Sequence, residues 1–403
     1  MVKKFVFHMF GNYKQTGADT QHTMKRSELG MLNDVIHNQL VIQKNNITAH
    51  HKSRRWDKYK KLTNDYELVF TSAQSFPSIA AYLPISRSYF KLWEILTDFR
   101  TELNFKTAPM KSVFLADAPG GFGEAFINFR NRDAESQDTM FGMSLRATNK
   151  IIPDWKFDKH YCTSNNLTLC YGKSGTGNLY NIRNIHDLID TVGRGQAEFV
   201  TADGGFDFSS DFNSQENMSI NLILCEIYAT LCLQQEGGSF VLKIYDIHSE
   251  TTIKMLYVLK LCYEHMYFMK PLSSRPANSE KYVVCTHFKR PKEYERLLTM
   301  LSTCIIRFDP RNVLPALDVP LTFTLDIIRY NKIYILQQAI HIMRTISMIE
   351  TSLNQPNSDE IQTQTNLIKQ QITKAIKWCH KYDIPVSFDA LKKYKPYYLS
   401  SLT

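Results

Sequence analysis

Charged residues at the ends of apolar runs are the first candidates for chemistry in this sequence. They are Asp203, which follows residues 198–202, Lys243, near the end of residues 239–244, and Glu280, just ahead of residues 282–286. If these runs are strands of an open α/β sheet, their ends meet at the edge where such sheets bind ligands. Two carboxylates beside a lysine could then orient a weakly acidic hydroxyl and remove its proton. For each residue alone, an ordinary ion pair at a strand end is the alternative.

A glycine-rich turn after another apolar run is a second candidate. Residues 113–126 have the sequence Val-Phe-Leu-Ala-Asp-Ala-Pro-Gly-Gly-Phe-Gly-Glu-Ala-Phe, and glycines let the backbone pass close to a nucleotide-like ligand. The turn lacks the Gly-Lys-Ser/Thr ending of a P-loop and the dinucleotide fingerprint, both of which bind phosphates. It therefore fits S-adenosylmethionine, which carries no phosphate and whose ammonium group Asp117 could meet. A purely structural strand-to-helix turn is the alternative.

The elements that must position these residues have the pattern of an α/β domain. From about residue 86 to 290, short β-rich runs alternate with helical patterns, which is typical of a parallel sheet flanked by helices. The predicted strands are 113–116, 139–144, 198–202, 239–244, 266–269 and 282–286. The apolar segment 216–235 contains neither Pro nor Gly, which predicts a buried crossover helix that Gly237 and Gly238 end.

The flanking segments differ from this middle part in composition. We predict an N-terminal extension over 1–80, a catalytic α/β domain over 81–290 and a helical C-terminal extension over 291–403, with helices at 325–353 and 361–380. In the stretch 50–61, basic residues alternate with aromatic ones. Lys and Arg could follow RNA phosphates there while Trp56 or Tyr59 stacks on a base. A solvated helix face is the favoured alternative.

Composition agrees with a folded protein that has an anionic partner. The chain carries 48 basic and 39 acidic residues, a net charge of +9, and 43% hydrophobic residues. Its eight cysteines show no metal-ligand spacing, which predicts free thiols in a reducing compartment. The N-terminus lacks a signal peptide, and no apolar run is long enough to span a membrane. We therefore expect a soluble intracellular protein without a membrane partner, in the host cytoplasm or the virion if it is viral.

Four segments carry a resemblance to a known family. They are 86–95 (Ser-Arg-Ser-Tyr-Phe-Lys-Leu-Trp-Glu-Ile), 117–124, 202–206 (Ala-Asp-Gly-Gly-Phe) and 274–285 (Ser-Arg-Pro-Ala-Asn-Ser-Glu-Lys-Tyr-Val-Val-Cys). Over Ser86 to Phe288 the chain resembles the FtsJ-type ribose 2'-O-methyltransferases, especially the mRNA cap ribose methyltransferases of eukaryotes and large DNA viruses. The resemblance implies a Rossmann-like methyltransferase sheet, S-adenosylmethionine as cofactor, and RNA as substrate, with the first transcribed nucleotide of capped mRNA as target.

The resemblance also implies roles for individual residues. It adds Lys91 to the three charged residues above, which gives the catalytic set Lys91, Asp203, Lys243 and Glu280. The implied cofactor contacts are Asp117, Ala118, Pro119, Gly120, Gly121, Phe122, Gly123, Ser144, Asn178 and Asp203, and the implied substrate contacts are Arg87, Ser274, Arg275 and Asn278. Like charge and burial disfavour an ammonium ion, so Lys91 is expected to lower the pKa of Lys243 and make it the base. This scheme requires no metal.

Two positions depart from the family pattern at the cofactor's adenosine end. Asn178 stands where an acidic residue is usual, and the run ending at Ser144 has no acid for the ribose hydroxyls. Loss of such a carboxylate predicts weaker cofactor binding, by about 1 to 3 kcal/mol. The alternative function is an RNA-binding or partner protein that keeps the fold without turnover, with the C-terminal helices as a partner surface. A nicotinamide dehydrogenase is strongly disfavoured because the phosphate-binding glycine pattern is missing.

Overall fold

The computed structural model describes residues 4–6, 26–51, 55–71, 76–105, 108–132, 137–149, 152–208, 211–354 and 357–399. Its centre is a mixed sheet with the strand order β1-β7-β8-β6-β5-β2-β3-β4. The strands are β1 (Lys4–Val6), β2 (Lys111–Leu115), β3 (Thr139–Met143), β4 (Leu167–Cys170), β5 (Ala197–Ala202), β6 (Gln234–Ile244), β7 (Tyr263–Met269) and β8 (Lys281–Phe288). Neighbours from β4 to β6 pair in parallel, whereas β8 is antiparallel to both β6 and β7. The predicted α/β class is confirmed.

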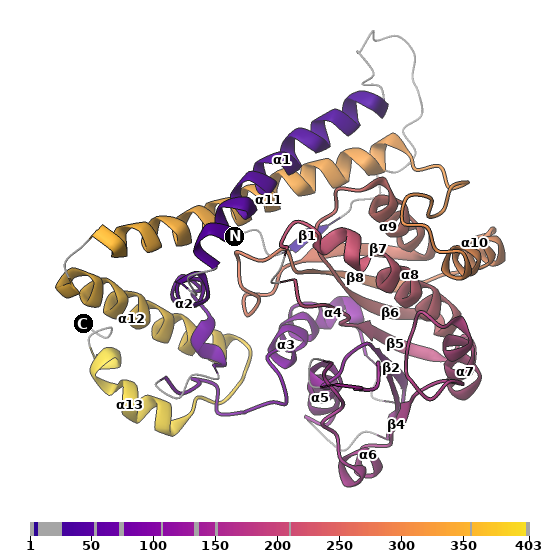
Figure 1. The fold of residues 1–403 in the computed structure, drawn as a ribbon. Helices are drawn as coiled ribbons and strands as arrows, with labels where there is room; N and C mark the ends of the chain where they lie inside the picture. Colours follow the sequence, from indigo (N-terminus) through magenta and orange to yellow (C-terminus); the bar gives the residue numbers. More distant parts are fainter. Residues whose placement is uncertain are drawn as a thin grey trace.

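Helices cover both faces of this sheet (Figure 1). The helices of the domain are α3 (Ser88–Asp98), α4 (Arg100–Leu103), α5 (Gly121–Arg130), α6 (Lys159–Ser164), α7 (Ile182–Val192), α8 (Gln215–Leu233), α9 (Glu250–Cys262) and α10 (Tyr294–Ile306). Successive residues of a strand point to opposite faces. Accordingly Val113 and Leu115 of β2 join a core with α7 to α10, while Phe114 joins a core with α3 and α5.

The crossover helix predicted over 216–235 is present as α8, but glycine does not end it. The helix passes directly into β6 at Gln234, and Gly237 and Gly238 lie inside that strand. Gln234 pairs with Ala197 of β5, and its side-chain amide donates to the carbonyl oxygen of Ala197. The transition is therefore set by strand pairing at Gln234, which the prediction from the glycines missed.

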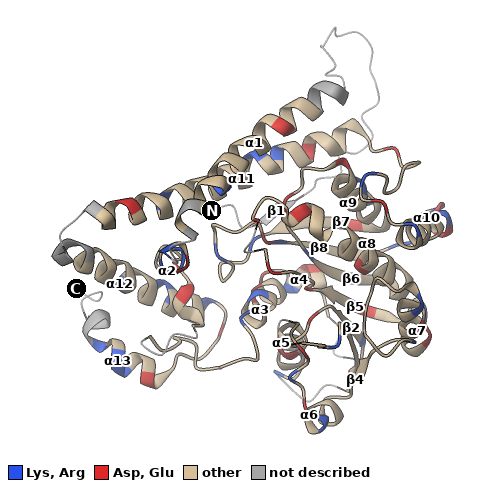
Figure 2. Ribbon diagram, in the orientation of Figure 1, with Lys and Arg blue, Asp and Glu red and all other residues tan. Residues whose placement is uncertain are grey.

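Helices from the two ends of the chain lie side by side. They are α1 (Arg26–His51), α2 (Arg55–Leu62), α11 (Leu321–Asn354), α12 (Asn357–Lys381) and α13 (Phe388–Leu399), and α1 runs along α11 (Figure 1). Trp56 and Tyr59 of α2 are each only 3% exposed, in a core shared with α1 and α11. The prediction that a base stacks on one of these rings is wrong, because both rings are buried in this core. The basic residues of α2 remain beside them (Figure 2), whereas Lys52 to Arg54 lie outside the described residues.

Helix α12, in the C-terminal extension, packs on the α/β domain through α3. Trp378 donates its indole N–H to Glu94 of α3 at 2.9 Å, and its ring meets the Phe90 ring edge-on at 5.4 Å. In the other direction, Trp93 donates to the Tyr382 carbonyl oxygen at 2.9 Å. The extension is thus part of the domain's core. No helix in the described ranges combines the length and apolar character that crossing a membrane requires.

Candidate active site

A cavity of about 730 Å³ opens where β2, β3, β5 and β6 end. Ala116 and Ala118 line it after β2, Ser144 after β3, Asp203 after β5, and Lys243 from the end of β6. Because parallel strands present their carboxyl ends at one edge, residues far apart in the chain meet there. Glu280, which precedes the antiparallel β8, reaches the same cavity. The convergence predicted for Asp203, Lys243 and Glu280 is therefore present.

The four predicted catalytic residues form two ion pairs. Lys91 Nζ lies 2.8 Å from the Glu280 carboxylate, and Lys243 Nζ lies 3.2 Å from Asp203 Oδ1. Lys243 also donates to the Asp203 carbonyl oxygen at 2.6 Å. The four side chains are 10 to 14% exposed. Lys91 does not line the cavity itself, so it acts on the cavity through its bond to Glu280.

Tyr282 is a site residue that the sequence analysis did not single out. Strand pairing sets Tyr282 of β8 opposite Lys243 of β6, and the Tyr282 hydroxyl donates to Asp203 Oδ1 at 3.1 Å. Asp203 is thus held by a lysine and a buried tyrosine at once. The signal was present, because Tyr282 belongs to the segment 274–285 that carries the family resemblance.

The electrostatics of the two ion pairs correct one expectation. Burial disfavours the ionised form of Glu280, but Lys91 and Lys243 outweigh it and lower the pKa of Glu280 to about 2. Burial also disfavours the ammonium of Lys243, yet Asp203, Tyr245 and Glu280 raise its pKa above the usual value. The prediction that Lys91 lowers the pKa of Lys243 is wrong for this arrangement. Lys91 is paired with Glu280, and the anions next to Lys243 dominate.

Asp117, at the start of the glycine turn, bonds to the helix that follows it. Asp117 accepts hydrogen bonds from the amides of Phe122 and Gly123, at 2.9 and 2.8 Å, at the start of α5. It is buried and does not line the cavity. A carboxylate at the N-terminus of a helix satisfies free amides there. In this structure Asp117 therefore caps α5, and its contact with the cofactor's ammonium group stays a prediction.

The glycines of the turn allow close packing around this cap. Gly120 has a left-handed backbone, with φ of +116°, and a Cβ there would lie 2.6 Å from the Phe157 ring. A Cβ on Gly121 would lie 2.2 Å from the hydroxyls of Ser86 and Ser88. The start of α5 can thus approach the start of α3, which carries Lys91. Gly120, Gly121, Phe122 and Gly123 are not among the residues that line the cavity, and their contacts with the cofactor stay predictions.

The remaining predicted cofactor residues line the cavity and fit S-adenosylmethionine. Ala118 and Pro119 give apolar surface, and Ser144, Asn178 and Asp203 give polar atoms. The volume is in the range of cofactor sites, and such sites are mostly apolar with a few polar groups that fix orientation. Asn178 Oδ1 accepts from the Tyr180 amide at 2.9 Å. Asn178 therefore stands at the cavity with its side chain already oriented.

Of the four predicted substrate residues only Arg87 lines this cavity, and all four are bonded to other parts of the protein. Arg275 and Asn278 line another cavity, of about 180 Å³. Ser274 donates to Glu280 Oε1 at 2.9 Å, and Arg275 pairs with Glu67 at 2.7 Å. Arg87 donates to the carbonyl oxygens of Ser273 and Phe70, at 3.1 and 2.8 Å. The two arginines thus connect the loop 270–280, which we call the rim, to Glu67 and Phe70. Their contact with RNA stays a prediction.

Lys270 organises this rim and was also missed. Its buried Nζ donates to Asn278 Oδ1, to the Asn278 carbonyl oxygen and to the Glu280 carbonyl oxygen, at 2.7, 2.9 and 2.6 Å. Glu94 accepts from the amides of Leu272 and Ser273, at 2.8 and 2.6 Å. The loop is therefore fixed by one buried lysine and one buried glutamate. Lys270 lies four residues before the segment 274–285 that carries the family resemblance, so that segment did not mark it.

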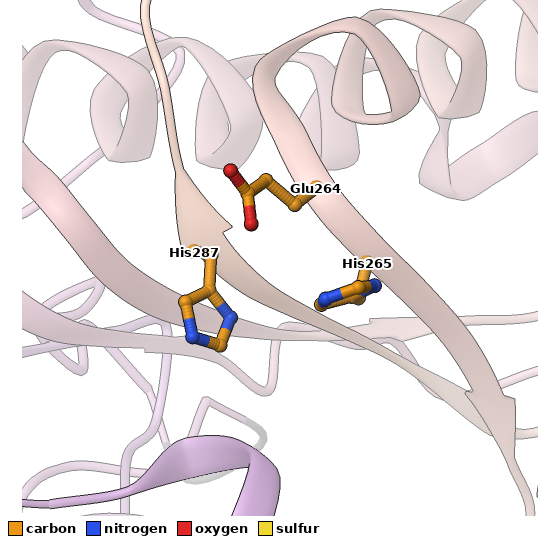
Figure 3. A group of neighbouring side chains, drawn as sticks. All are labelled: Glu264, His265 and His287. Carbon is orange, nitrogen blue, oxygen red and sulfur yellow. The ribbon is translucent and has the colours of Figure 1, made fainter. Parts of the chain in front are cut away.

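Potential metal ligands gather elsewhere in the described part of the chain. Glu264, His265 and His287 are exposed, and their ligand atoms lie within 4.8 Å of one another (Figure 3). They come from the start of β7 and the end of β8, whereas Glu280 lies ahead of the start of β8. At about 3.3 Å per residue, the length of β8 separates this cluster from the catalytic residues. The cluster takes no part in the site described above.

Comparisons with known proteins point to one family. Residues 84–288 match the model of the FtsJ-like methyltransferases. Cap-specific mRNA (nucleoside-2'-O-)-methyltransferase 1 of Mus musculus is 34% identical over 195 residues, covering 46% of this chain and 22% of the relative. Its Danio rerio counterpart is 36% identical over 180 residues, covering 42% and 21%. The matches thus span less than a quarter of these relatives. A putative ribosomal RNA methyltransferase from Plasmodium falciparum, 17% identical, covers 50% of this chain and 97% of its own, with a TM-score of 0.37.

Proposed function

Because the chain belongs to the FtsJ-like methyltransferase family, we propose that it transfers a methyl group from S-adenosylmethionine to a ribose 2'-hydroxyl of RNA. The target we propose is the first transcribed nucleotide of capped mRNA, in line with the cap-specific relatives. The observation that carries the proposal is the meeting of Asp203, Lys243 and Glu280 at one cavity, with Lys91 paired to Glu280.

We assign one group of cavity residues to the cofactor and another to the ribose hydroxyl. When bound, S-adenosylmethionine supplies an electrophilic methyl group. Ala118, Pro119, Ser144 and Asn178 would hold it against the ends of β2 and β3. The ribose hydroxyl would enter next to Lys243 and Glu280, which line the cavity. Asp203 also lines the cavity, beside Lys243. Fixing the hydroxyl in line with the methyl group supplies much of the rate gain in such transfers.

The hydroxyl proton must leave as the new carbon–oxygen bond forms. We assign this proton to Lys243, because Lys243 lines the cavity and Asp203 fixes the direction of its Nζ. Since Asp203, Tyr245 and Glu280 raise the pKa of Lys243, its ammonium form dominates at neutral pH. As ammonium it orients the hydroxyl oxygen, and as free amine it accepts the proton. The rate should therefore increase with pH above neutrality.

RNA binding rests on charge and on the rim of the cavity. The net charge of +9 favours an anionic substrate. We propose that Arg87, which lines the cavity, contacts the RNA together with Ser274, Arg275 and Asn278. The Arg275 side chain is the most exposed of the two rim arginines, at 31% against 18% for Arg87.

The test is methyl transfer from labelled S-adenosylmethionine to matched RNAs with and without a cap, followed by mapping of the methylated nucleotide. Transfer to the ribose of the first nucleotide of capped RNA is the expected result. Transfer at an internal position of both RNAs would contradict the cap assignment. Equal transfer by wild type and Lys243→Ala would contradict the catalytic scheme.

A second function has one specific observation in its favour. Asn178 stands at the cavity where the family resemblance implies an acid, which suits a protein that binds RNA without turnover. Calorimetric titration with S-adenosylmethionine separates the two functions. No heat of binding at millimolar cofactor, together with retained RNA binding, would favour the second function.

A further inference from the structure

A buried carboxyl group lies directly behind the catalytic residues without a role in the scheme above. Glu226 is on α8 and is 1% exposed. A Cβ built on Gly204, the residue after Asp203, would lie 2.3 Å from Glu226 Oε1. The carboxyl group is thus packed against the turn that carries Asp203. Among the described residues, Oε1 has no hydrogen-bond partner, which is costly for a buried polar atom and unusual in a native core.

The surroundings of Glu226 make its charge matter to the site. The groups that face it are Lys243 at the end of β6, Asp203 after β5, Tyr245 after β6, Tyr180, and its neighbour Cys225. Burial raises the pKa of Glu226 to about 8, and the charge of Asp203 also raises it. The charge of Lys243 and a hydrogen bond from the Gly204 amide to the Glu226 carboxyl group lower it. Glu226 is therefore neutral at pH 7 and ionises on the alkaline side of neutrality.

We propose that Glu226 is a positioning residue of this site, which acts through Lys243: its neutral form supports the Asp203–Gly204 turn, and its ionisation holds Lys243 as ammonium. The inference rests on the proposed function, since it takes Lys243 to be the group that receives the hydroxyl proton. An ionised Glu226 would add a negative charge to a site that already contains Asp203 and Glu280. A further anion stabilises the ammonium and reduces the fraction of free amine.

The ionisation of Glu226 determines how the kcat of Glu226→Gln compares with that of wild type at each pH. Below about pH 8 Glu226 is protonated and resembles glutamine in charge and shape, so Glu226→Gln should match wild type. Above that pH wild type gains an anion next to Lys243 and the variant does not. The ratio of kcat for Glu226→Gln to kcat for wild type should therefore rise with pH. A purely space-filling Glu226 would leave the ratio constant.

The first experiment measures this ratio on capped RNA from about pH 6 to about pH 9. We expect a ratio near one at the acidic end and a rise of about threefold or more at the alkaline end, since one pKa unit on Lys243 is a tenfold change in free amine. Thr230→Val is the matched control, because Thr230 is one turn further along α8, is buried, and its hydroxyl also has no partner among the described residues. Its ratio to wild type should stay flat. A flat ratio for Glu226→Gln would overturn the inference.

A second experiment does not depend on methyl transfer. Infrared difference spectra of Glu226→Gln against wild type should show the band of a protonated carboxylic acid at about pH 6, which disappears through about pH 8. In the Lys243→Met background the same band should persist to higher pH, because Lys243 lowers the pKa of Glu226. Absence of the band, or the same titration in both backgrounds, would overturn the inference. Loss of the proposed function alone would leave these spectra unchanged.

Discussion

At the level of single residues, Lys243 has the most demanding position in the site. Its Nζ contacts both the carboxylate and the backbone carbonyl of Asp203 and lines the cavity. We expect Lys243→Met to lower kcat by about 10² to 10⁴-fold, the range of general acid–base catalysis, and to change the cofactor Kd by less than about threefold. Rates of labelled methyl transfer and calorimetry with S-adenosylmethionine measure the two quantities. Lys254→Met is the control, because Lys254 pairs with Glu250 on α9 and lies outside the cavity.

Asn178 tests whether the cofactor pocket is weakened. It lines the cavity, and its Oδ1 already accepts from the Tyr180 amide, a bond that an aspartate can also accept. We expect Asn178→Asp to tighten S-adenosylmethionine binding by about tenfold, because a carboxylate accepts stronger hydrogen bonds than an amide. Titration calorimetry of the two proteins gives the Kd ratio. Weaker binding by the variant would mean that the amide donates to the cofactor, contrary to the expected geometry.

At the level of elements, the loop between β7 and β8 depends on Lys270. Three of its hydrogen bonds fix Asn278 and the backbone of Glu280, and a fourth, of 3.4 Å, goes to Ser274 Oγ. Lys270→Met leaves these buried acceptors unpaired, so we expect an increase of KM for RNA and a decrease of kcat, each about tenfold, with cofactor affinity nearly unchanged. Steady-state kinetics and calorimetry measure the split. Lys260→Met is the matched control, since the buried Lys260 ammonium has no hydrogen-bond partner among the described residues and lies on α9, away from the loop.

The elements also differ in how far the sequence predicts them. β2, β3, β5, β6, β7 and β8 are apolar runs bounded by turn residues, and each was predicted within a few residues. β4 has four residues and β1 three, which is too short for a periodic pattern. Helix α1 was missed because its pattern is only weakly amphipathic, and its apolar contacts are with α11, about 300 residues later. The positions of Lys91, Asp203, Lys243 and Glu280 followed from motifs and strand ends. Their pairing did not, because it depends on side-chain directions across four elements.

At the level of the whole molecule, the C-terminal helices and the substrate rim are physically linked. Glu94 of α3 accepts from Trp378 of α12 and from the amides of Leu272 and Ser273 in the rim. Helix α12 is thus connected to the site through the buried side chain of Glu94. A contact of these helices with a protein partner stays a prediction, and any such contact on α12 would act on the rim through Glu94.

This link predicts a combined effect of one substitution on stability and on substrate binding. Trp378→Phe keeps most of the ring packing against Phe90 but removes the indole donor from Glu94. We expect the free energy of unfolding to fall by about 1 to 3 kcal/mol, since a buried charged acceptor loses a partner, and KM for RNA to rise several-fold. Chemical denaturation and steady-state kinetics measure the two effects.

Trp155→Phe is the control for the loss of an indole donor. The buried Trp155 indole N–H has no partner among the described residues, so its removal should lower the free energy of unfolding by less. If both variants lost equal stability and kept the wild-type KM, Trp378 would serve packing alone and the rim would not depend on α12.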